Sequence, residues 1–402
     1  MSNVLLLVSA MAFALVFLHP RLLRMPRWRA TVTPLASIIG SGFLVSGPIL
    51  AEVAGTQAWM AMLGLCAVAY LFGWAIRHNI AHVEPLLGGD LASPWVTGME
   101  RVSELALSLA YFVSVAYYLN LLAAFGLRLV GVTDPLSIRL GASVAIIAVG
   151  ALGLSGGLSA MERLAARAVG LKLSVIAALL LMLFVVSAVD ATHHQLVWPV
   201  LDHARGTQEL RVLLGLVILV QGFETSRYLG EHYEGALRVR TMRWAQWIST
   251  AIYLGFVLLI TRYFGGTLPS EGGETAIIDM LKPLGVTVAP MIIIAALASQ
   301  LSAAVADANG NGGLLAEVSR GRIPAHIGNA ITALAALGMT WLANIYEIIT
   351  YASQLFVAYY ALQSLQAAGS AWSLGMKARA ACFVAACLLA VVIVVFAIPA
   401  AA

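Results

Sequence analysis

The stretch TVTPLASIIGSGFLVSGPILAEVAG, residues 31–55, decides the fold of this chain. It is long and apolar enough to cross a bilayer, which takes about 20 apolar residues. A Gly-Ser-Gly triplet at residues 40–42 interrupts it near the middle, and Pro34 and Pro48 lie to either side. Because proline removes a backbone donor and glycine permits unusual dihedral angles, the pattern predicts a transmembrane helix that is broken near the bilayer midplane.

A second interrupted segment lies at residues 213–233 and reads LLGLVILVQGFETSRYLGEHY, with Gly222 beyond its midpoint. Gly40 and Gly222 are about 182 residues apart, and the apolar segments that follow each of them repeat at nearly the same offset. Each unit has five segments, and because five is odd the second unit crosses the membrane in the opposite sense. Such an inverted repeat predicts a binding site at the midplane, between the two broken helices.

The composition places most of the chain in lipid. Its 402 residues are 61% hydrophobic and only 10% charged, whereas a soluble domain has about 25% charged residues to cover its surface. These values exclude a soluble enzyme, a secreted module and a disordered scaffold. Strands of a membrane barrel alternate apolar and polar residues, which this chain does not. We therefore expect an all-α membrane protein of the cytoplasmic (inner or plasma) membrane.

Apolar runs between polar, proline and glycine residues predict about twelve transmembrane helices. The first run has no basic residues before it and no cleavage motif after it, so we expect an uncleaved anchor rather than a signal peptide. The expected units are an extra N-terminal helix (1–20), two five-helix repeats (31–190 and 208–368) and a C-terminal helix (378–402). The runs are 3–19, 31–54, 57–77, 99–130, 137–155, 161–188, 208–230, 241–264, 284–308, 325–343, 346–367 and 379–400.

Basic residues fall mainly on one side of this predicted topology. If the connection at residues 20–30 is cytoplasmic, 17 of the 23 Lys and Arg residues lie on the cytoplasmic side and six lie outside. Cytoplasmic connections carry an excess of Lys and Arg, so the bias predicts an N-terminus outside the cell. It also accounts for the net charge of +4 without a nucleic-acid partner. The 17 are Arg21, Arg24, Arg27, Arg29, Arg77, Arg101, Arg163, Arg167, Lys172, Arg227, Arg238, Arg240, Arg243, Arg320, Arg322, Lys377 and Arg379.

The first break is a candidate site for an anion. An unwound helix at Gly40, Ser41 and Gly42 exposes backbone N–H groups and the positive end of a helix dipole, and both favour a carboxylate. The alternative is a patch of small residues that only packs against another helix. The flanking prolines and the partner break at Gly222 favour the binding site.

The second break is a candidate site for a cation. Unwinding around Gly222 frees the carbonyl groups of Val220 and Gln221, which then accept hydrogen bonds from an ammonium or bind a cation. Phe223, the next residue, is a candidate lid over the site.

Two charges inside the predicted helices are candidates for ion coupling, because ionisable groups in a membrane usually mark functional positions. Glu224 follows the second break, and an ion pair with Arg227, three residues on, is an equally good structural alternative. Lys172 lies about a third of the way into its helix. It either extends to the interface or stays buried, where a lysine can take up and release a proton during transport.

The ninth run adds weaker candidates. Ser299 and Ser302 share a helix face and can offer hydroxyl oxygens to Na⁺, although such serines more often bond to their own helix. Asp307 and Asn309 form a polar cluster that is either functional or a helix C-cap before the glycines that follow. Five polar residues of the eleventh run are candidates to line a pathway: Tyr346, Tyr351, Gln354, Tyr359 and Tyr360.

Signatures of enzymes and metal sites are weak. Gly141-Ala142-Ser143 is similar to the nucleophile motif of an intramembrane serine protease, but His193-His194 falls in a predicted outer loop. The zinc-protease, nucleotide and dinucleotide motifs are absent. Cys66, Cys382 and Cys387 lie in apolar runs without metal-ligand spacing. We therefore expect neither catalysis nor a cofactor.

Four stretches stand in a characteristic order: IIGSGFLVSGPIL (38–50), VGLKLSVIAALLL (169–181), QGFETSRYLGEHY (221–233) and LLAEVSRGRIP (314–324). They resemble, in turn, four motifs of the amino acid–polyamine–organocation (APC) superfamily of secondary transporters. These are the first-helix glycine motif, the fifth-helix lysine segment, the sixth-helix "GFE" segment and the short stretch after the eighth helix.

The resemblance implies a leucine-transporter-type five-plus-five fold that works by alternating access. In such relatives the first break binds the substrate carboxylate, the carbonyls of the second break bind its amine, and an aromatic residue covers it. The matching positions here are Gly40, Ser41 and Gly42, then Val220, Gln221 and Gly222, then Phe223. Lys172 matches the lysine that replaces a sodium ion in proton-coupled members. Sodium-coupled members carry adjacent Ser/Thr residues, whereas Ser299 and Ser302 are three apart.

The chain departs from typical relatives in two places: it has the extra N-terminal helix, and EGALRVRTMR (234–243) replaces the usual Asn-Pro and Arg-x-x-Pro after the sixth helix. We expect a proton-coupled transporter of an amino acid or a related small organic amine. The alternative is a Na⁺-coupled or uncoupled carrier of another solute, such as a nucleobase or a metal ion, and a membrane enzyme is a remote third.

Overall fold

The computed structural model describes residues 2–87, 93–156, 158–199, 206–230, 232–265 and 273–400, and within these ranges the chain is helical with no strand. The side chains of Ser41 and of residues 158–168 also lie outside the description. The helices of the first half are α1 (Ser2–Phe17), α2 (Pro20–Arg24), α3 (Pro26–Ser41), α4 (Phe43–Ala54), α5 (Ala58–His82), α6 (Glu84–Leu87), α7 (Pro94–Leu127), α8 (Pro135–Leu154) and α9 (Leu158–Thr192). Those of the second half are α10 (Thr207–Leu214), α11 (Gly235–Ile260), α12 (Ile277–Met280), α13 (Val288–Val318), α14 (Ala325–Leu342), α15 (Ile345–Ser373) and α16 (Lys377–Phe396).

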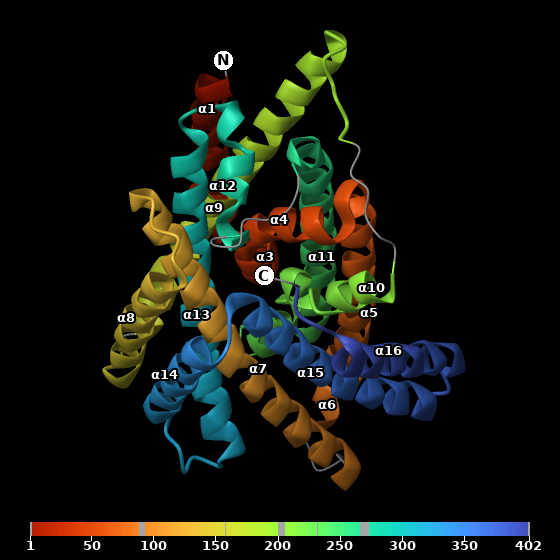
Figure 1. Cartoon of the computed structure of the whole chain (residues 1–402). Helices are drawn as coiled ribbons and strands as arrows, with labels where there is room; N and C mark the ends of the chain where they lie inside the picture. Colours follow the sequence, from red (N-terminus) through yellow and green to blue (C-terminus); the bar gives the residue numbers. More distant parts are fainter. Residues whose placement is uncertain are drawn as a thin grey trace.

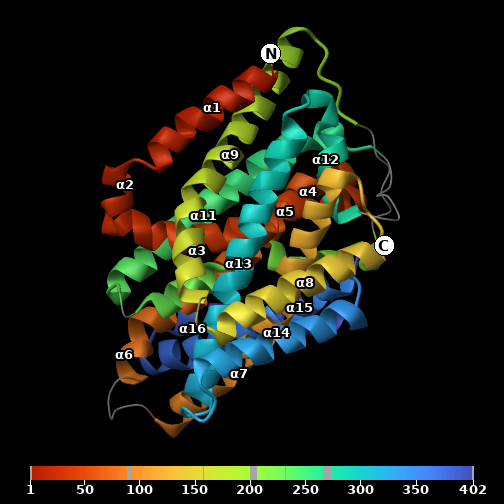
Figure 2. The same cartoon turned by 90° about the vertical axis from the view of Figure 1, so that its left-hand side faces the viewer.

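Helices at equivalent places in the two halves pack against each other. α5 contacts α11, α7 contacts α13, and α8 contacts α14 (Figures 1 and 2). The last long helix of each half crosses to the other half, because α9 packs on α13 and α15 packs on α7. This reciprocal packing is what an inverted five-plus-five repeat produces. The unit boundaries themselves, 31–190 and 208–368, stay predictions.

Two helices lie outside this pairing. α1 runs along α9 at one edge of the molecule and turns through α2 into α3 (Figure 2). α16 runs along α15 at another edge (Figure 1). They correspond to the extra N-terminal helix and the C-terminal helix expected from the sequence.

Eight helical segments of the described ranges are long and apolar enough to cross a membrane, so the expected number of twelve is not confirmed. Two of the missing four are the interrupted segments, in which the break leaves pieces too short to span alone. The others are α14 and α15, whose hydropathy is lowered by polar residues such as Asn329, Gln363 and Gln366.

Candidate functional site

The first break is a single residue rather than a long unwound stretch. α3 ends at Ser41, α4 begins at Phe43, and Gly42 between them keeps nearly helical dihedral angles of φ −90° and ψ −18°. The carbonyl of Gly42 still accepts a 2.8 Å hydrogen bond from the Ser46 N–H. The opening of the helix over Gly40, Ser41 and Gly42 is therefore smaller than predicted.

The second break is unwound over most of its length. α10 ends at Leu214, and two 3₁₀ helices follow, Val217–Val220 and Phe223–Leu229. Between them Gln221 is extended and Gly222 has a φ of +112°, a conformation that side chains other than hydrogen disfavour. The sequence prediction of a broken helix at Gly222 is confirmed.

The two breaks lie in direct backbone contact. A Cβ atom added to Gly42 would overlap the backbone of Leu219. One added to Gly222 would lie 2.7 Å from the carbonyl carbon of Ser37 and 2.8 Å from the nitrogen of Ile38. Each glycine thus permits one broken segment to approach the other, which is the packing role that small residues have in membranes. Their role in substrate binding stays a prediction.

Tyr253 of α11 joins the two segments. Its hydroxyl lies 2.5 Å from the carbonyl oxygen of Leu219 and 3.0 Å from that of Ile38, so it can donate to either. From α15, the hydroxyl of Ser353 accepts a 2.8 Å hydrogen bond from the Ile218 N–H. Helices of the second repeat therefore stabilise the unwound backbone, as buried polar groups in a membrane require.

Glu224 points toward α15 and is almost fully buried, with 1% exposure. Its carboxylate accepts hydrogen bonds from the Gly222 N–H at 3.0 Å and from the Tyr360 hydroxyl at 2.7 Å. Phe223 stacks on the same Tyr360 ring, with centroids 5.0 Å apart. The predicted lid residue thus packs in the aromatic core beside the second break.

The alternative of an ion pair between Glu224 and Arg227 is wrong. The Arg227 guanidinium instead lies 2.8 Å from Glu100 of α7 and 3.6 Å from Glu84 of α6. Arg238 of α11 also reaches Glu84, at 2.6 Å. The arginine therefore belongs to a separate charged network, which ties the end of the second break to three neighbouring helices.

Lys172 is buried in the core, with 2% exposure, so the alternative in which it extends to the interface is wrong. Its ammonium donates a 2.7 Å hydrogen bond to the carbonyl oxygen of Ala36 on α3. It also lies 3.5 Å from where a Cβ of Gly40 would be, and Ala303 of α13 lies 3.7 Å from the same point. Three helices thus meet at the triplet, and the lysine is the charged group among them.

Ser299 and Ser302 both lie on α13, the first buried and the second half-buried. The interpretation of Asp307 and Asn309 as a C-cap is wrong, because α13 continues without a break to Val318. Asp307 is instead buried in mid-helix, where its carboxylate accepts a 2.5 Å hydrogen bond from Ser114 of α7.

Asp307 and Glu224 are two buried carboxylates, with 6% and 1% exposure. Among the described residues, neither forms a salt bridge with Lys, Arg or His. Their partners are hydroxyl groups and one backbone amide. In the sequence, the glycines after Asp307 resemble the end of a helix, so they suggest a capping residue rather than a buried one. The apolar residues Ala303, Ala304 and Val305 before it indicate instead that this acid is buried.

The tyrosines of α15 divide between two environments. Tyr359 and Tyr360 are fully buried beside the second break, and Gln221 donates a 2.9 Å hydrogen bond to Tyr118 in the same region. Tyr351 is 41% exposed, so it does not line the core. Gln354 donates to the carbonyl of Val394 on α16 at 3.0 Å, and Tyr346 is buried near the start of the helix.

A model for a family of APC superfamily transporters matches residues 20–397. The chain belongs to the APC superfamily of transporters. An uncharacterized protein of Aquifex aeolicus (strain VF5) is 39% identical to this transporter over 368 residues, which cover 91% of this chain and 89% of that protein. The N-terminal 19 residues, which include all of α1, lie outside the matched family segment.

The fold of this APC transporter is shared with a Na⁺-coupled sialic acid symporter in a substrate-bound, outward-open state. The TM-score is 0.55 at 14% sequence identity, and the likeness covers 100% of this chain and 98% of the symporter. At this identity the likeness shows the fold alone, which is the leucine-transporter type expected from the sequence.

Proposed function

We propose that this transporter moves an amino acid or a related small organic amine across the membrane by alternating access, coupled to protons. The observation that carries the proposal is the position of Lys172, a buried ammonium hydrogen-bonded to α3 beside the first break. Loss or gain of its proton changes the strength of the contact between α9 and α3, because hydrogen bonds from charged donors are about twice as strong as neutral ones. Proton exchange and movement of the broken helix are thereby linked.

The amine of the substrate has a suitable partner in the second break. Glu224 and Asp307 supply buried negative charge, and Tyr360 and Phe223 supply aromatic faces, which attract cations. The carbonyls near Val220, Gln221 and Gly222 are further acceptors. A positively charged amine at this position would compensate carboxylates that lack a basic partner in the described part of the chain.

The substrate carboxylate is assigned to the first break, at the start of α4. Backbone N–H groups at a helix N-terminus and the helix dipole favour an anion there. Gly40, Ser41 and Gly42 carry no charge, so the selectivity comes from the backbone. The buried Lys172, close to Gly40, adds positive charge on the same side.

Uptake into proteoliposomes tests this proposal. A panel of radiolabelled amino acids and monoamines is offered to liposomes with and without an imposed pH gradient, acidic on the substrate side. We expect at least one amine to accumulate, and a protonophore to abolish the accumulation. Accumulation that is equal with and without the gradient would contradict proton coupling while leaving transport intact.

A second candidate is a Na⁺-coupled carrier of another solute. Two observations favour it: Ser299 and Ser302 lie on α13, which faces the first break through Ala303, and the sialic acid symporter that shares the fold is Na⁺-coupled. Na⁺-dependent uptake that is lost in the variant Ser302→Ala would support this candidate over the first.

A further inference from the structure

The extra helix α1 and its continuation α2 enclose a seam against the transporter core. α1 packs along α9, and α2 leads into α3, so three core helices, α3, α9 and α11, form the other wall (Figure 2). Three pockets follow this seam from the end rich in arginine toward the opposite membrane face. Neighbouring pockets share lining residues, and the last of the three is lined by Phe43 and Leu44 at the start of α4, close to the first break.

The first pocket opens at the arginine-rich end and has a volume of about 350 Å³. Arg27 of α3 and Arg240 of α11 line it, together with the indole rings of Trp28 and Trp244. None of its lining residues is acidic, and neither arginine forms a salt bridge with any described residue. Tryptophan is enriched at membrane–water interfaces, which places this mouth at headgroup depth.

The second pocket continues the first into the membrane. It has a volume of about 210 Å³ and shares Trp28 and Ile248 with the mouth. Its remaining lining residues are apolar side chains of α1, α3, α9 and α11, among them Phe17, Leu35 and Ala177. A soluble anion would gain no favourable contact from this apolar crevice, whereas the hydrocarbon chain of a lipid can pack against its walls.

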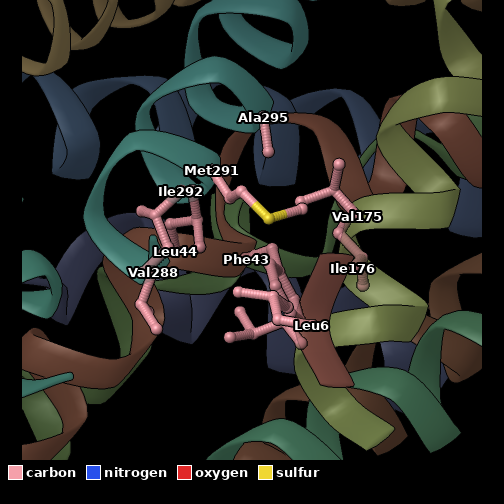
Figure 3. Close-up of a pocket in the computed structure, with 10 residues that line it drawn as sticks. Leu6, Phe43, Leu44, Val175, Ile176, Val288, Met291, Ile292 and Ala295 are labelled. Atoms are coloured by element: carbon pink, nitrogen blue, oxygen red, sulfur yellow. The ribbon is translucent and has the colours of Figure 1, made fainter. Parts of the chain in front are cut away.

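The third pocket extends the seam along α1. It shares Ile176 with the second pocket and has a volume of about 10 Å³, lined only by apolar residues. In Figure 3, Leu6 of α1, Phe43 of α4 and Met291 of α13 point into this space from different helices. Side chains nearly fill the seam here, so its open part ends at the second pocket.

We propose that this seam binds one anionic phospholipid, with its phosphate between Arg27 and Arg240 and an acyl chain in the apolar crevice. The charge of the mouth complements a phosphate, for which guanidinium groups have matching geometry. Clusters of basic residues beside a membrane helix attract anionic lipids. The adjoining crevice distinguishes the seam from a basic surface alone, because the crevice can hold an acyl chain, which a free phosphate does not have.

The position of the site gives the bound lipid a structural role. Leu173, which lines the crevice, is the neighbour of Lys172, and Leu35 on the opposite wall is the neighbour of Ala36. The acyl chain therefore lies against the two helices that the lysine joins. The headgroup connects α3 to α11, so the lipid links the first repeat to the second.

Native mass spectrometry of the purified transporter tests the proposal, with phosphatidylglycerol or phosphatidylcholine added to the detergent. We expect one retained phosphatidylglycerol and a preference over phosphatidylcholine of about tenfold or more, because two basic residues at the mouth attract an anionic headgroup. The variant Arg27→Gln/Arg240→Gln removes most of that preference. The control Arg29→Gln/Arg243→Gln removes two exposed arginines that lie within three residues of Arg27 and Arg240 on the same two helices. Neither of them lines the mouth, so we expect binding to stay within about twofold.

A crevice variant separates the lipid from a soluble anion. Ala177→Trp fills the apolar pocket and leaves the mouth intact, so we expect it to lose phosphatidylglycerol. Thermal unfolding of each variant, measured without added lipid, verifies that the protein is folded. Equal loss of binding in both arginine pairs, equal retention of the two lipids, or displacement of the lipid by inorganic phosphate would each overturn the proposal.

Discussion

The Tyr360 hydroxyl donates a 2.7 Å hydrogen bond to the Glu224 carboxylate, and this bond ties the second break to the long helix α15. The ring of the same tyrosine stacks on Phe223, so one side chain holds both residues that follow Gly222. The contact is fully buried. It fixes the direction of the carboxylate that we assign to the substrate amine.

Removal of that hydroxyl provides a direct test of the contact. Tyr360→Phe keeps the ring and its stacking, but it leaves the buried carboxylate with one donor fewer. We expect the free energy of unfolding to fall by about 1.5–3 kcal/mol, the range for a hydrogen bond to a charged group. Tyr351→Phe, on the exposed face of the same helix, is the control and should behave as wild type.

A double-mutant cycle with Glu224→Gln assigns the effect to the pair. If the two residues stabilise each other, the double variant loses less stability than the sum of the single variants, by about 0.5–3 kcal/mol. Thermal unfolding in detergent measures all four proteins. Strictly additive losses would show that the bond contributes nothing.

Gly42 and Gly222 are expected to tolerate no side chain. Gly42→Ala places a methyl group against the backbone of Leu219, and Gly222→Ala adds the strain of a φ of +112°. Overpacking of this kind lowers stability by about 1–3 kcal/mol. Gly64→Ala in α5, where nothing lies within 4 Å, is the control and should be neutral or slightly stabilising.

Thermal unfolding and transport are both informative for the glycine variants. Because the backbone-to-backbone contact sets the distance between the two broken segments, we expect Gly42→Ala to lose transport even where enough folded protein remains. A Gly42→Ala transporter with wild-type stability and uptake would show that the two segments have room to separate.

The sequence was sufficient for the broken helices because their signals are local. Glycine weakens an apolar helix at the point where it lies, with flanking prolines in the first segment only, and the equal offset after Gly40 and Gly222 indicates the repeat. The extent of unwinding was not predictable. Gly42 keeps nearly helical angles between α3 and α4, whereas the second break is stabilised by Tyr253 and Ser353, which are 34 and 135 positions from the residues they bond, Leu219 and Ile218.

Partners of charged residues were the least predictable part of the site. Arg227 is three residues from Glu224, but its partners Glu84 and Glu100 are more than 120 positions earlier in the chain. Spacing within one helix cannot reveal such long-range pairs. The same holds for Lys172, whose burial depends on the neighbouring α3 and α13 rather than on its own apolar run.

Arg227 is expected to be essential for stability. Its guanidinium is 4% exposed and lies 2.8 Å from Glu100, so Arg227→Gln leaves a poorly solvated carboxylate without its basic partner. Breaking a buried pair in this way costs about 3–5 kcal/mol. The double variant Arg227→Gln/Glu100→Gln removes both charges and should recover part of that loss.

The pair of Arg128 and Asp279 supplies the comparison for this network. Asp279 is 53% exposed, so its ion pair is well solvated and Arg128→Gln should lose at most about 1 kcal/mol. Thermal unfolding of Arg227→Gln and Arg128→Gln compares the stability lost from the buried pair with that lost from the exposed pair. Equal losses from Arg227→Gln and Arg128→Gln would contradict a special role for the buried network.

Asp134 gives a prediction for the dependence of stability on pH. It is the N-cap of α8 and lies outside the membrane-spanning segments, where its carboxylate accepts a 2.8 Å hydrogen bond from the Ser137 N–H. Hydrogen bonds from Ser137 hold the pKa of this carboxyl below its usual value. The contribution to stability is therefore present at neutral pH and is lost as the pH falls through the folded-state pKa.

Asp134→Asn keeps a capping side chain but removes the titration. We expect the melting temperatures of wild type and variant to differ at pH 7 and to converge under acidic conditions. A difference that is constant over the whole pH range would show that the charge of Asp134 has no part in capping α8.

Lys172 is the residue whose substitution most directly tests proton coupling. Lys172→Met keeps a long apolar side chain but removes the donor to the Ala36 carbonyl and the group that exchanges a proton. If the lysine couples the pH gradient to movement of α3, the variant cannot accumulate substrate against a gradient, yet it still exchanges internal for external substrate. Lys282→Met, outside the candidate membrane spans, is the matched control and should accumulate substrate as wild type does. Gradient-driven accumulation by Lys172→Met would assign coupling to another group, with Glu224 and Asp307 next in line, whereas loss of exchange as well would mean that the bond to Ala36 holds the site together.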